Sequence, residues 1–420
     1  MLVLSRLDLF GCLPIVQKST TREMHRGGGP LLTTNVVGGL GNQLFLLANL
    51  ISTASRHRNA HPHHHTPLQM AVPRVSSSDS CGPPRPVYWD SLFQNLTTGA
   101  GVALVPSLPR DYKTVVVPEK RPVVPVTLPN EQNHHNDDVI YSLTGFFQSH
   151  IYFGGGADHE EASSSRASNG GDVLLSLLPT HYRRGAQTHL HANYLPAGVA
   201  PEKCHTVGVH IRRGDYLAIR DVFPILEFDY YDLALRTLLG PVLYKAPYAL
   251  SPPTPVSSKQ ADGRSATTEG ILFPTPTSAV GHQATRVLLF SEDAVYANAL
   301  AGTWRVKYPG IYVAHVDPTH ELSSSVERSF SSAGGGAHDS NNNNSSVAAP
   351  AAPPPPPRDV VELLMMTQCD DLIIANSSFS WWGAYWNRCP GRRVVAPTKW
   401  FVADPFPSAA HLYPKEWILL

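Results

Sequence analysis

Short apolar runs alternate along the chain with stretches whose apolar residues recur at helical spacing. The runs predict strands at 34–37, 206–211, 286–290, 371–375 and 392–397. The patterns between them predict helices at 44–55, 230–240, 294–302 and 360–368, with a fifth inside 376–388. Alternation of this kind is typical of parallel sheets flanked by helices, so the chain is predicted to have an α/β fold.

Polar residues and glycines gather where several of these strands end. They occupy Gly38–Gln43, Arg212–Asp215, Ser291–Asp293 and Asn376–Ser380. Ligands of parallel sheets bind at the carboxyl ends of the strands, so these four loops hold the candidate binding residues.

Long inserts of low complexity interrupt this pattern. None has an apolar face to bury, and they lie near 57–86, 154–172, 246–281 and 320–357. The first contains the histidine cluster His61 and His63–His65. Low-complexity histidine in a linker is usually incidental, so we predict no metal site there.

Charge and composition exclude some classes of partner. Lys plus Arg and Asp plus Glu number 33 each, so the net charge is zero. This argues against nucleic acid or an anionic membrane as a partner in bulk, and any bound anion must be gripped locally. The five cysteines form no CxxC pair, and no segment has the roughly 18 consecutive apolar residues of a membrane span.

Two adjacent arginines follow the strand at 206–211. Strand alternation places His210 and Arg212 on one face and Arg213 on the other. A guanidinium matches phosphate oxygens in a bidentate fork, so we expect Arg212 to bind a phosphate. We expect Arg213 to brace the site through Asp215. The alternative is an ordinary surface ion pair for both.

The glycine-rich turn does not fit the dinucleotide fingerprint, because Leu44 stands where the third glycine is needed. What remains is a backbone turn around Gly41 at a helix N-terminus, with the amides of Asn42 and Gln43 available to donate. A tight turn with no ligand explains the pattern equally well.

The other two loops offer acceptors and donors. Ser291, Glu292 and Asp293 end a strand, where a carboxylate can accept from a guanine edge; taken alone, capping of the next helix is the better explanation. Asn376, Ser377, Ser378, Phe379 and Ser380 open a helix whose N–H groups and dipole suit an anion. The aromatic residues that follow, Trp381, Trp382, Tyr385 and Trp386, are expected in the core.

Together these motifs resemble a known family. "GGLGNQLF", "GFFQSHIYF", "VGVHIRRGDYL", "LLFSED" and "ANSSFSWWGAYWN" occur in the order seen in the α-1,2-fucosyltransferases of glycosyltransferase family 11, from Asn35 to about Phe401. The resemblance implies a GT-B fold, in which two Rossmann-like domains face each other across a cleft. We place the acceptor-side domain at 33–190 and the nucleotide-sugar-binding domain at 203–420.

The resemblance also implies roles for the loop residues. It implies transfer of fucose from GDP-fucose, with inversion, to the 2-hydroxyl of a terminal β-galactoside. Arg212 would contact the β-phosphate and His210 would lie toward the nucleotide. Glu292 or Asp293 would contact guanine, Ser377–Ser380 would hold the diphosphate, and Asn42 would reach the reacting region from the other domain.

The sequence contains no D-x-D motif, so we predict a metal-independent enzyme with no cofactor beyond its donor substrate. Arg212, Asn42 and Asp215 are the predicted catalytic residues. Spacing does not choose the general base among Asp215, Asp221 and Glu227.

Two other functions stay open on the sequence alone. One is a fucosyltransferase of another linkage or acceptor, and the other is an inactive relative that only binds a GDP-sugar. Animal members of the family carry an N-terminal membrane anchor, which would place the protein in the Golgi membrane or lumen. Arg6 and Asp8 interrupt the apolar start of this chain, so a cytoplasmic location and the question of membrane association stay open.

Overall fold

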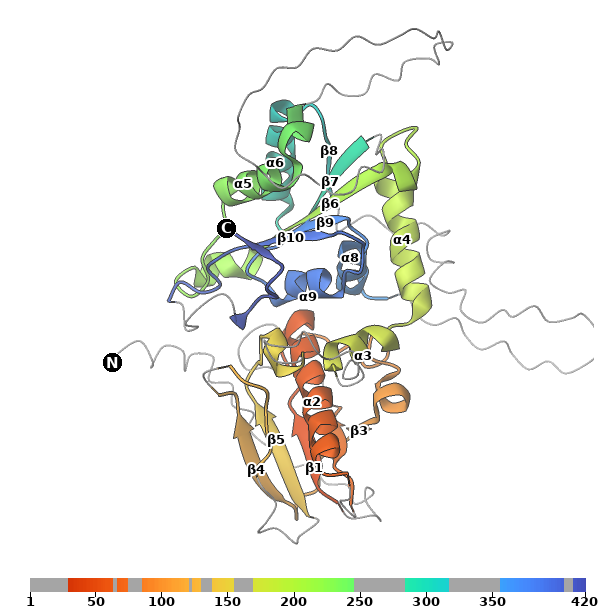
Figure 1. Ribbon diagram of the computed structural model, residues 1–420, viewed down its shortest axis with the longest axis vertical. Coiled ribbons are helices and arrows are strands. Elements are labelled where there is room, and N and C mark those ends of the chain that lie inside the picture. The colour runs from red at the N-terminus through yellow and green to blue at the C-terminus, as the bar shows by residue number, and fades with distance from the viewer. Residues whose placement is uncertain are drawn as a thin grey trace, which may run out of the picture.

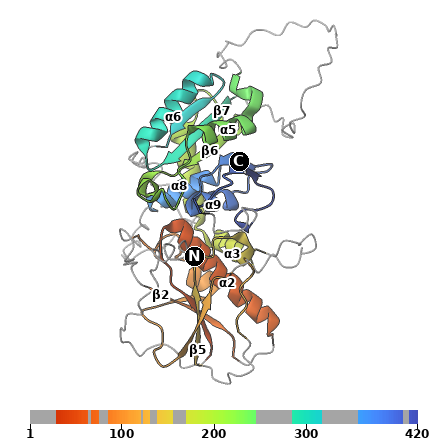
Figure 2. The ribbon, with the colours of Figure 1, turned by 90° about the vertical axis from the view of Figure 1, so that its left-hand side faces the viewer.

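A computed structural model describes residues 29–62, 66–74, 85–120, 123–129, 138–154, 169–244, 284–316, 356–403 and 411–420. It contains two parallel β-sheets, one above the other in both views (Figures 1 and 2). The expectation of an α/β fold with two parallel-sheet domains is confirmed. The insert expected near 246–281 lies outside the described residues, and so does the one expected near 320–357 except for its last two residues.

The first sheet has the strand order β3-β2-β1-β5-β4, and every neighbouring pair is parallel. Its strands are β1 (Leu31–Thr34), β2 (Gln69–Pro73), β3 (Val102–Val105), β4 (Lys113–Pro118) and β5 (Val139–Thr144). The order reverses between β1 and β5, so the loops after these two strands open at the same point of the sheet edge.

The second sheet has the order β11-β10-β9-β6-β7-β8, again entirely parallel. Its strands are β6 (Cys204–Ile211), β7 (Ala284–Ser291), β8 (Tyr312–His315), β9 (Asp371–Ile373), β10 (Arg393–Ala396) and β11 (Ile418–Leu419). Counted within this domain, the order is 6-5-4-1-2-3, that of the dinucleotide-binding Rossmann fold, with its switch point between β6 and β9.

The described α-helices are α2 (Leu40–Ala60), α3 (Gly170–Leu177), α4 (Thr180–Tyr194), α5 (Phe228–Leu239), α6 (Ala294–Lys307), α8 (Arg358–Met366) and α9 (Ser378–Trp386). Helix α2 packs on the first sheet, whereas α5, α6, α8 and α9 cover the two faces of the second sheet. Val207, Val209 and Ile211 of β6 pack with α5 and α6 on one face. Leu288 and Phe290 of β7 face the other way, into a core shared with α8 and α9.

One hydrophobic core crosses from the first domain into the second. Phe45 of α2 lies 4.7 Å from Trp381 and 5.1 Å from Trp382 of α9, ring centre to ring centre. Phe153 stacks on Trp382 at 5.3 Å, and the Trp386 indole donates to the carbonyl of Gly171. In Figure 1, α2 and α9 accordingly meet between the two sheets. The expectation of a core role is confirmed for the three tryptophans of α9, which are all buried.

The structure corrects one expected insert. Within 57–86, helix α2 continues to Ala60 and strand β2 occupies Gln69–Pro73, so that range is not one continuous insert. The composition around His61 hides the helix end, and strand β2 is too short to give a pattern of its own. Within 154–172, helix α3 begins at Gly170, with Asn169 as its N-cap; residues 155–168 lie outside the described residues.

Candidate functional site

The predicted binding loops meet at the carboxyl edge of the second sheet. Arg212 follows β6, Glu292 follows β7, and Asn376 lies just past β9. Because β6 and β9 flank the switch point, the loops after them diverge to opposite faces and leave room for a ligand. The candidate site is therefore built around Arg212.

Arg212 is held between carboxylates. Its guanidinium donates to Asp215 at 2.5 Å and to Glu292 at 3.1 Å, and it lies 4.9 Å from the centre of the Tyr216 ring. Only 22% of the side chain is exposed. The guanidinium is thus fixed in place by acceptors and an aromatic face, yet it remains open on one side to an anion.

Arg213 has the bracing role expected of it, but with different partners. It donates to Glu227 at 2.9 Å and to Asp293 at 3.3 Å, and its guanidinium lies 4.1 Å from the Tyr296 ring centre. The expected pairing with Asp215 is wrong, because Arg213 points to the opposite face of the strand from Arg212, and Asp215 pairs with Arg212 instead. Strand alternation places the two arginines correctly but does not identify their acceptors.

Asp293 has a structural role at the start of α6. It is the N-cap of α6 and accepts from the backbone N–H of Tyr296 at 3.0 Å, while its own N–H donates to the Ser291 hydroxyl. The capping explanation of this loop is confirmed. Glu292, at 37% side-chain exposure, is the carboxylate here that does not cap the helix.

His210 is buried directly beneath this edge. It is 4% exposed, and its ring lies 5.4 Å from that of Phe379 at the start of α9. Burial, with repulsion from Arg212, lowers the pKa of the imidazole to about 3. Among the described residues its Nδ1 has no hydrogen-bond partner. At neutral pH His210 is therefore an uncharged group with a free ring nitrogen.

This burial predicts acid sensitivity. From pH 6.5 down to about 3 the unfolded chain binds a proton at His210 that the folded chain does not. The stabilisation is therefore complete above pH 6.5 and falls by up to about 1.4 kcal/mol per pH unit below it. Urea unfolding at pH 7.5 and 5.5 should show a smaller loss for His210→Gln than for the unchanged protein. Equal losses in both proteins would contradict this account.

Two helix N-termini converge beside Arg212. Neither α2 nor α9 has a side-chain cap, so the first N–H groups of both helices lack that acceptor. A Cβ on Gly41, in the first turn of α2, would lie 2.5 Å from the backbone nitrogen of Phe379 in the first turn of α9. Tyr216, under Arg212, donates to the carbonyl of Asn376 just before α9. Two positive dipole ends and one arginine thus share a small region, which favours an anion.

Asn42 is oriented by a residue that the sequence did not indicate. Gln148, in the loop after β5, donates to the Asn42 side-chain oxygen at 2.8 Å, which leaves the Asn42 NH₂ group to point elsewhere. That loop contains Phe147, whose φ of 51° is unusual for a residue other than glycine. Glu119 secures the loop by accepting from the backbone N–H groups of Phe146 and Phe147.

Three predicted donors are used inside the protein. The Gln43 amide donates to the carbonyls of Gly38 and Pro86, which corrects the expectation that it is available to a ligand. The Asn376 amide donates to Pro224 and Trp400, and the Ser380 hydroxyl to Ala375 and Ser377. Asn376 and Ser380 hold the Asn376–Ser380 loop in shape, which leaves its backbone N–H groups, Ser377 and Ser378 as its candidate ligand donors.

Arg85 is a charged residue near the site that the sequence did not indicate. It comes from the first domain and lies 3.3 Å from Asp215, which therefore bridges Arg85 and Arg212. Its neighbourhood in sequence is rich in proline and glycine and gave no signal of a site. The aromatic support of Arg212 by Tyr216 was also missed, although Tyr216 lies in the quoted motif.

The C-terminal part of the chain is similar to a known family of enzymes. Residues 356–420, which include β9, the Asn376–Ser380 loop and α9, match the model of glycosyl transferase family 11. This C-terminal segment is therefore similar to glycosyl transferase family 11. The O-antigen biosynthesis glycosyltransferase WbnK of Escherichia coli is 41% identical over 54 residues, which are 13% of this chain and 17% of the length of that enzyme.

Two solved structures are similar over most of the chain at low identity. FUT1 of Arabidopsis thaliana, a mutant in complex with GDP, has 12% identity and a TM-score of 0.37 over 88% of this chain and 71% of that one. A family 9 glycosyl transferase of Veillonella parvula has 10% identity and a TM-score of 0.34 over 93% and 85%. Among the described residues, no three His, Cys, Asp or Glu side chains are grouped to hold a metal, and no helix has the length and apolarity to cross a membrane.

Proposed function

We propose that the protein is an inverting glycosyltransferase that moves L-fucose from GDP-fucose to the 2-hydroxyl of a terminal β-galactoside. The observation that carries this proposal is the close contact of the uncapped N-termini of α2 and α9, with Arg212 linked to the α9 end through Tyr216. The similarity to glycosyl transferase family 11 of the segment that forms one of these N-termini supports it. A diphosphate fits a site that offers a guanidinium and two sets of backbone N–H groups.

The chemistry requires help for the leaving group. The bond between fucose C1 and the β-phosphate oxygen breaks, and GDP leaves with an added negative charge. Arg212, the α9 N-terminus and the Asn42 NH₂ group are placed to stabilise this charge, and donors of this kind typically supply about 3 kcal/mol each. Since Gln148 fixes Asn42 by its oxygen, the NH₂ group is already oriented as a donor.

On the acceptor side, a base must take the proton of the attacking hydroxyl as the new bond to C1 forms. We assign this role to Asp215. Glu227 pairs with the bracing Arg213, whereas Asp215, which is exposed as Asp221 is, contacts Arg212 directly. Its second partner, Arg85, lies 3.3 Å away and helps to hold the carboxylate in position.

A transfer assay in chelator tests both the reaction and its electrostatics. With GDP-fucose and lactose, we expect fucosylated product to form at the same rate with EDTA as without it, because the positive charge comes from the protein. The product should be cleaved by an α-1,2-specific fucosidase. Activity lost in EDTA and restored by Mg²⁺ or Mn²⁺ would overturn the metal-free mechanism. A product resistant to that fucosidase would reject the α-1,2 linkage but would leave the proposed donor site in place.

A further inference from the structure

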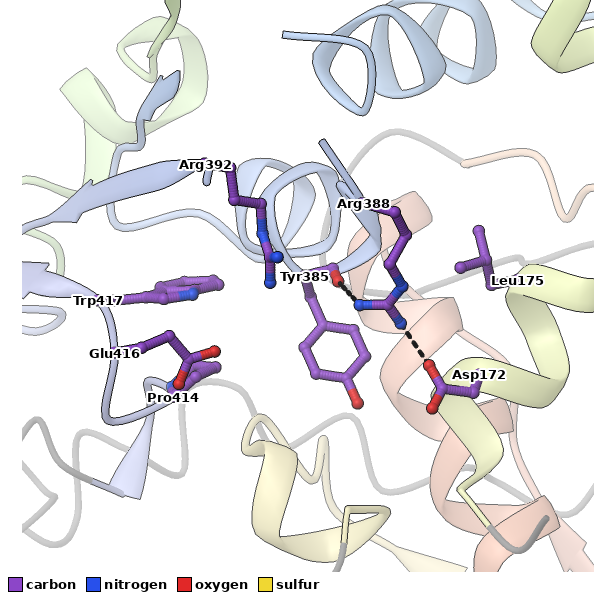
Figure 3. A pocket seen from close by; sticks show the side chains of 8 residues that line it. All are labelled: Asp172, Leu175, Tyr385, Arg388, Arg392, Pro414, Glu416 and Trp417. Atoms are coloured by element: carbon purple, nitrogen blue, oxygen red, sulfur yellow. Dashed lines mark hydrogen bonds and ion pairs between the residues drawn. The ribbon is translucent and has the colours of Figure 1, made fainter. Parts of the chain in front are cut away.

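A second hollow lies at the other end of α9, away from Arg212. It encloses about 510 Å³, within the roughly 300–1,000 Å³ that is usual for ligand pockets. Figure 3 shows side chains from three parts of the chain turned toward it: Asp172 of α3, Tyr385 and Arg388 at and after the end of α9, and Arg392, Glu416 and Trp417 further on. The nine residues of α9 separate it from the Ser378 end by about 13 Å, at about 1.5 Å per residue.

Two residues that line this hollow carry buried hydrogen-bond donors without a protein acceptor in the described part of the chain. The Arg392 guanidinium extends between Trp417 and Tyr385 (Figure 3). Its Nε is buried and has no partner among the described residues, and the same is true of the indole N–H of Trp417, a residue only 6% exposed. Buried donors are seldom left unpaired, so an acceptor from outside the protein is expected at this point.

The charges in the hollow cancel. Arg388 is already paired with Asp172, and Arg392 faces a region that also contains the exposed carboxylate of Glu416. A site for an anion would present an excess of positive charge, which is absent from this set. Burial raises the pKa of Tyr385 to about 12, so its hydroxyl is neutral. The set suits a neutral ligand that both donates and accepts hydrogen bonds.

The apolar part of the hollow is rigid. Trp381 stacks on Tyr385 at 4.9 Å and contacts Trp417 at 5.7 Å, so one buried ring holds both lining aromatics. A hexose unit combines an apolar C–H face with a rim of hydroxyls, and therefore matches aromatic rings surrounded by arginine and carboxylate groups. A preformed surface of this kind binds with little ordering cost.

We propose that this hollow is a carbohydrate-binding site that takes a neutral hexose unit of a glycan, apart from the galactose that receives fucose. The choice of a glycan rests on the proposed function, since an enzyme that modifies glycans meets them as substrates. The contacts themselves are independent of the transfer reaction. Binding therefore occurs with or without GDP-fucose.

The test is a titration of the full chain with lactose and with a neutral tetrasaccharide ending in β-galactose, without donor, by calorimetry. Arg392→Ala should weaken tetrasaccharide binding at least tenfold. Trp417→Phe, which keeps the ring but removes the donor, should weaken it about threefold. Arg183→Ala, at an exposed arginine of α4, is the matched control and should bind as the unchanged protein does. Melting temperatures establish that each variant is folded.

Three results would overturn the proposal: no saccharide binding by the unchanged protein, unchanged binding in folded Arg392→Ala, or tighter binding of inorganic phosphate than of the tetrasaccharide at Arg392. The transfer assay is read separately. Arg392-dependent binding without any transfer would retain this site and reject the proposed function. Transfer without Arg392-dependent binding would reject this site and retain the proposed function.

Discussion

Replacing Arg212 with alanine should lower the rate of fucose transfer by about 10²–10³-fold, the usual effect of removing one group that stabilises a transition-state charge. The substitution also leaves Asp215 and Glu292 at the site without their shared cation, so they repel the diphosphate. We therefore expect weaker GDP binding as well. Steady-state kinetics and calorimetry with GDP measure the two effects.

Two variants sharpen this experiment. Arg212→Lys keeps the charge but loses the bidentate fork, and should give an activity between those of alanine and arginine. Arg220→Ala removes an exposed arginine eight residues further along and should stay within about twofold of the unchanged protein, as surface substitutions usually do. If Arg212→Ala keeps more than a fifth of the activity, this guanidinium is not the phosphate ligand.

The second large effect is expected from a single methyl group at Gly41. In Gly41→Ala the new Cβ would overlap the backbone of Ser378 and Phe379, which cannot move aside as a flexible side chain does. Overpacking of this kind typically costs about 1–3 kcal/mol, and we expect the upper end because the atoms that the new Cβ meets are all backbone. Urea unfolding should show this loss. The rate of fucose transfer should fall by more than the loss in unfolding free energy alone would cause, because the two helix N-termini are pushed apart.

The neighbouring glycine provides the control. Gly39 has a φ of −68°, and a Cβ there would meet no atom within 4 Å. Gly39→Ala should therefore cost less than about 1 kcal/mol, the usual penalty for alanine at an N-cap. If the two variants are equally stable and equally active, the close contact between α2 and α9 does not hold in solution.

The second sheet was predictable from sequence because its central strands are buried on both faces. β6, β7 and β9 are buried along almost their whole length and most of their residues are apolar, although polar residues interrupt β6, and the helices between them have clear spacing. The short strands β2 and β3 and the edge strand β4 gave no usable pattern, since they are brief, partly exposed and bounded by proline or irregular segments. Their pairing depends on β1 and β5, which lie far away in sequence.

For the site, the sequence identified the residues at the strand ends but not their hydrogen-bond and ion-pair partners. The apolar runs that predict strands located Arg212, His210 and the Asn376–Ser380 loop, which lie at or just after the ends of those runs. The acceptors of Arg212 and the orientation of Asn42 depend on residues brought together from distant strands, such as Glu292 and Gln148. The left-handed backbone at Phe147 also has no sequence signal, because glycine or asparagine is normally expected in that conformation.

The core that joins α2 to α9 has a further meaning for the protein as a whole. A fragment that ends between α4 and β6 would leave Phe45 and Phe153 without the tryptophans that cover them, and the complementary fragment would expose Trp381 and Trp382. Neither half is therefore a self-sufficient folding unit, despite having its own sheet. The protein should melt in one cooperative step, and limited proteolysis within 195–203 should destroy both halves together rather than release one intact.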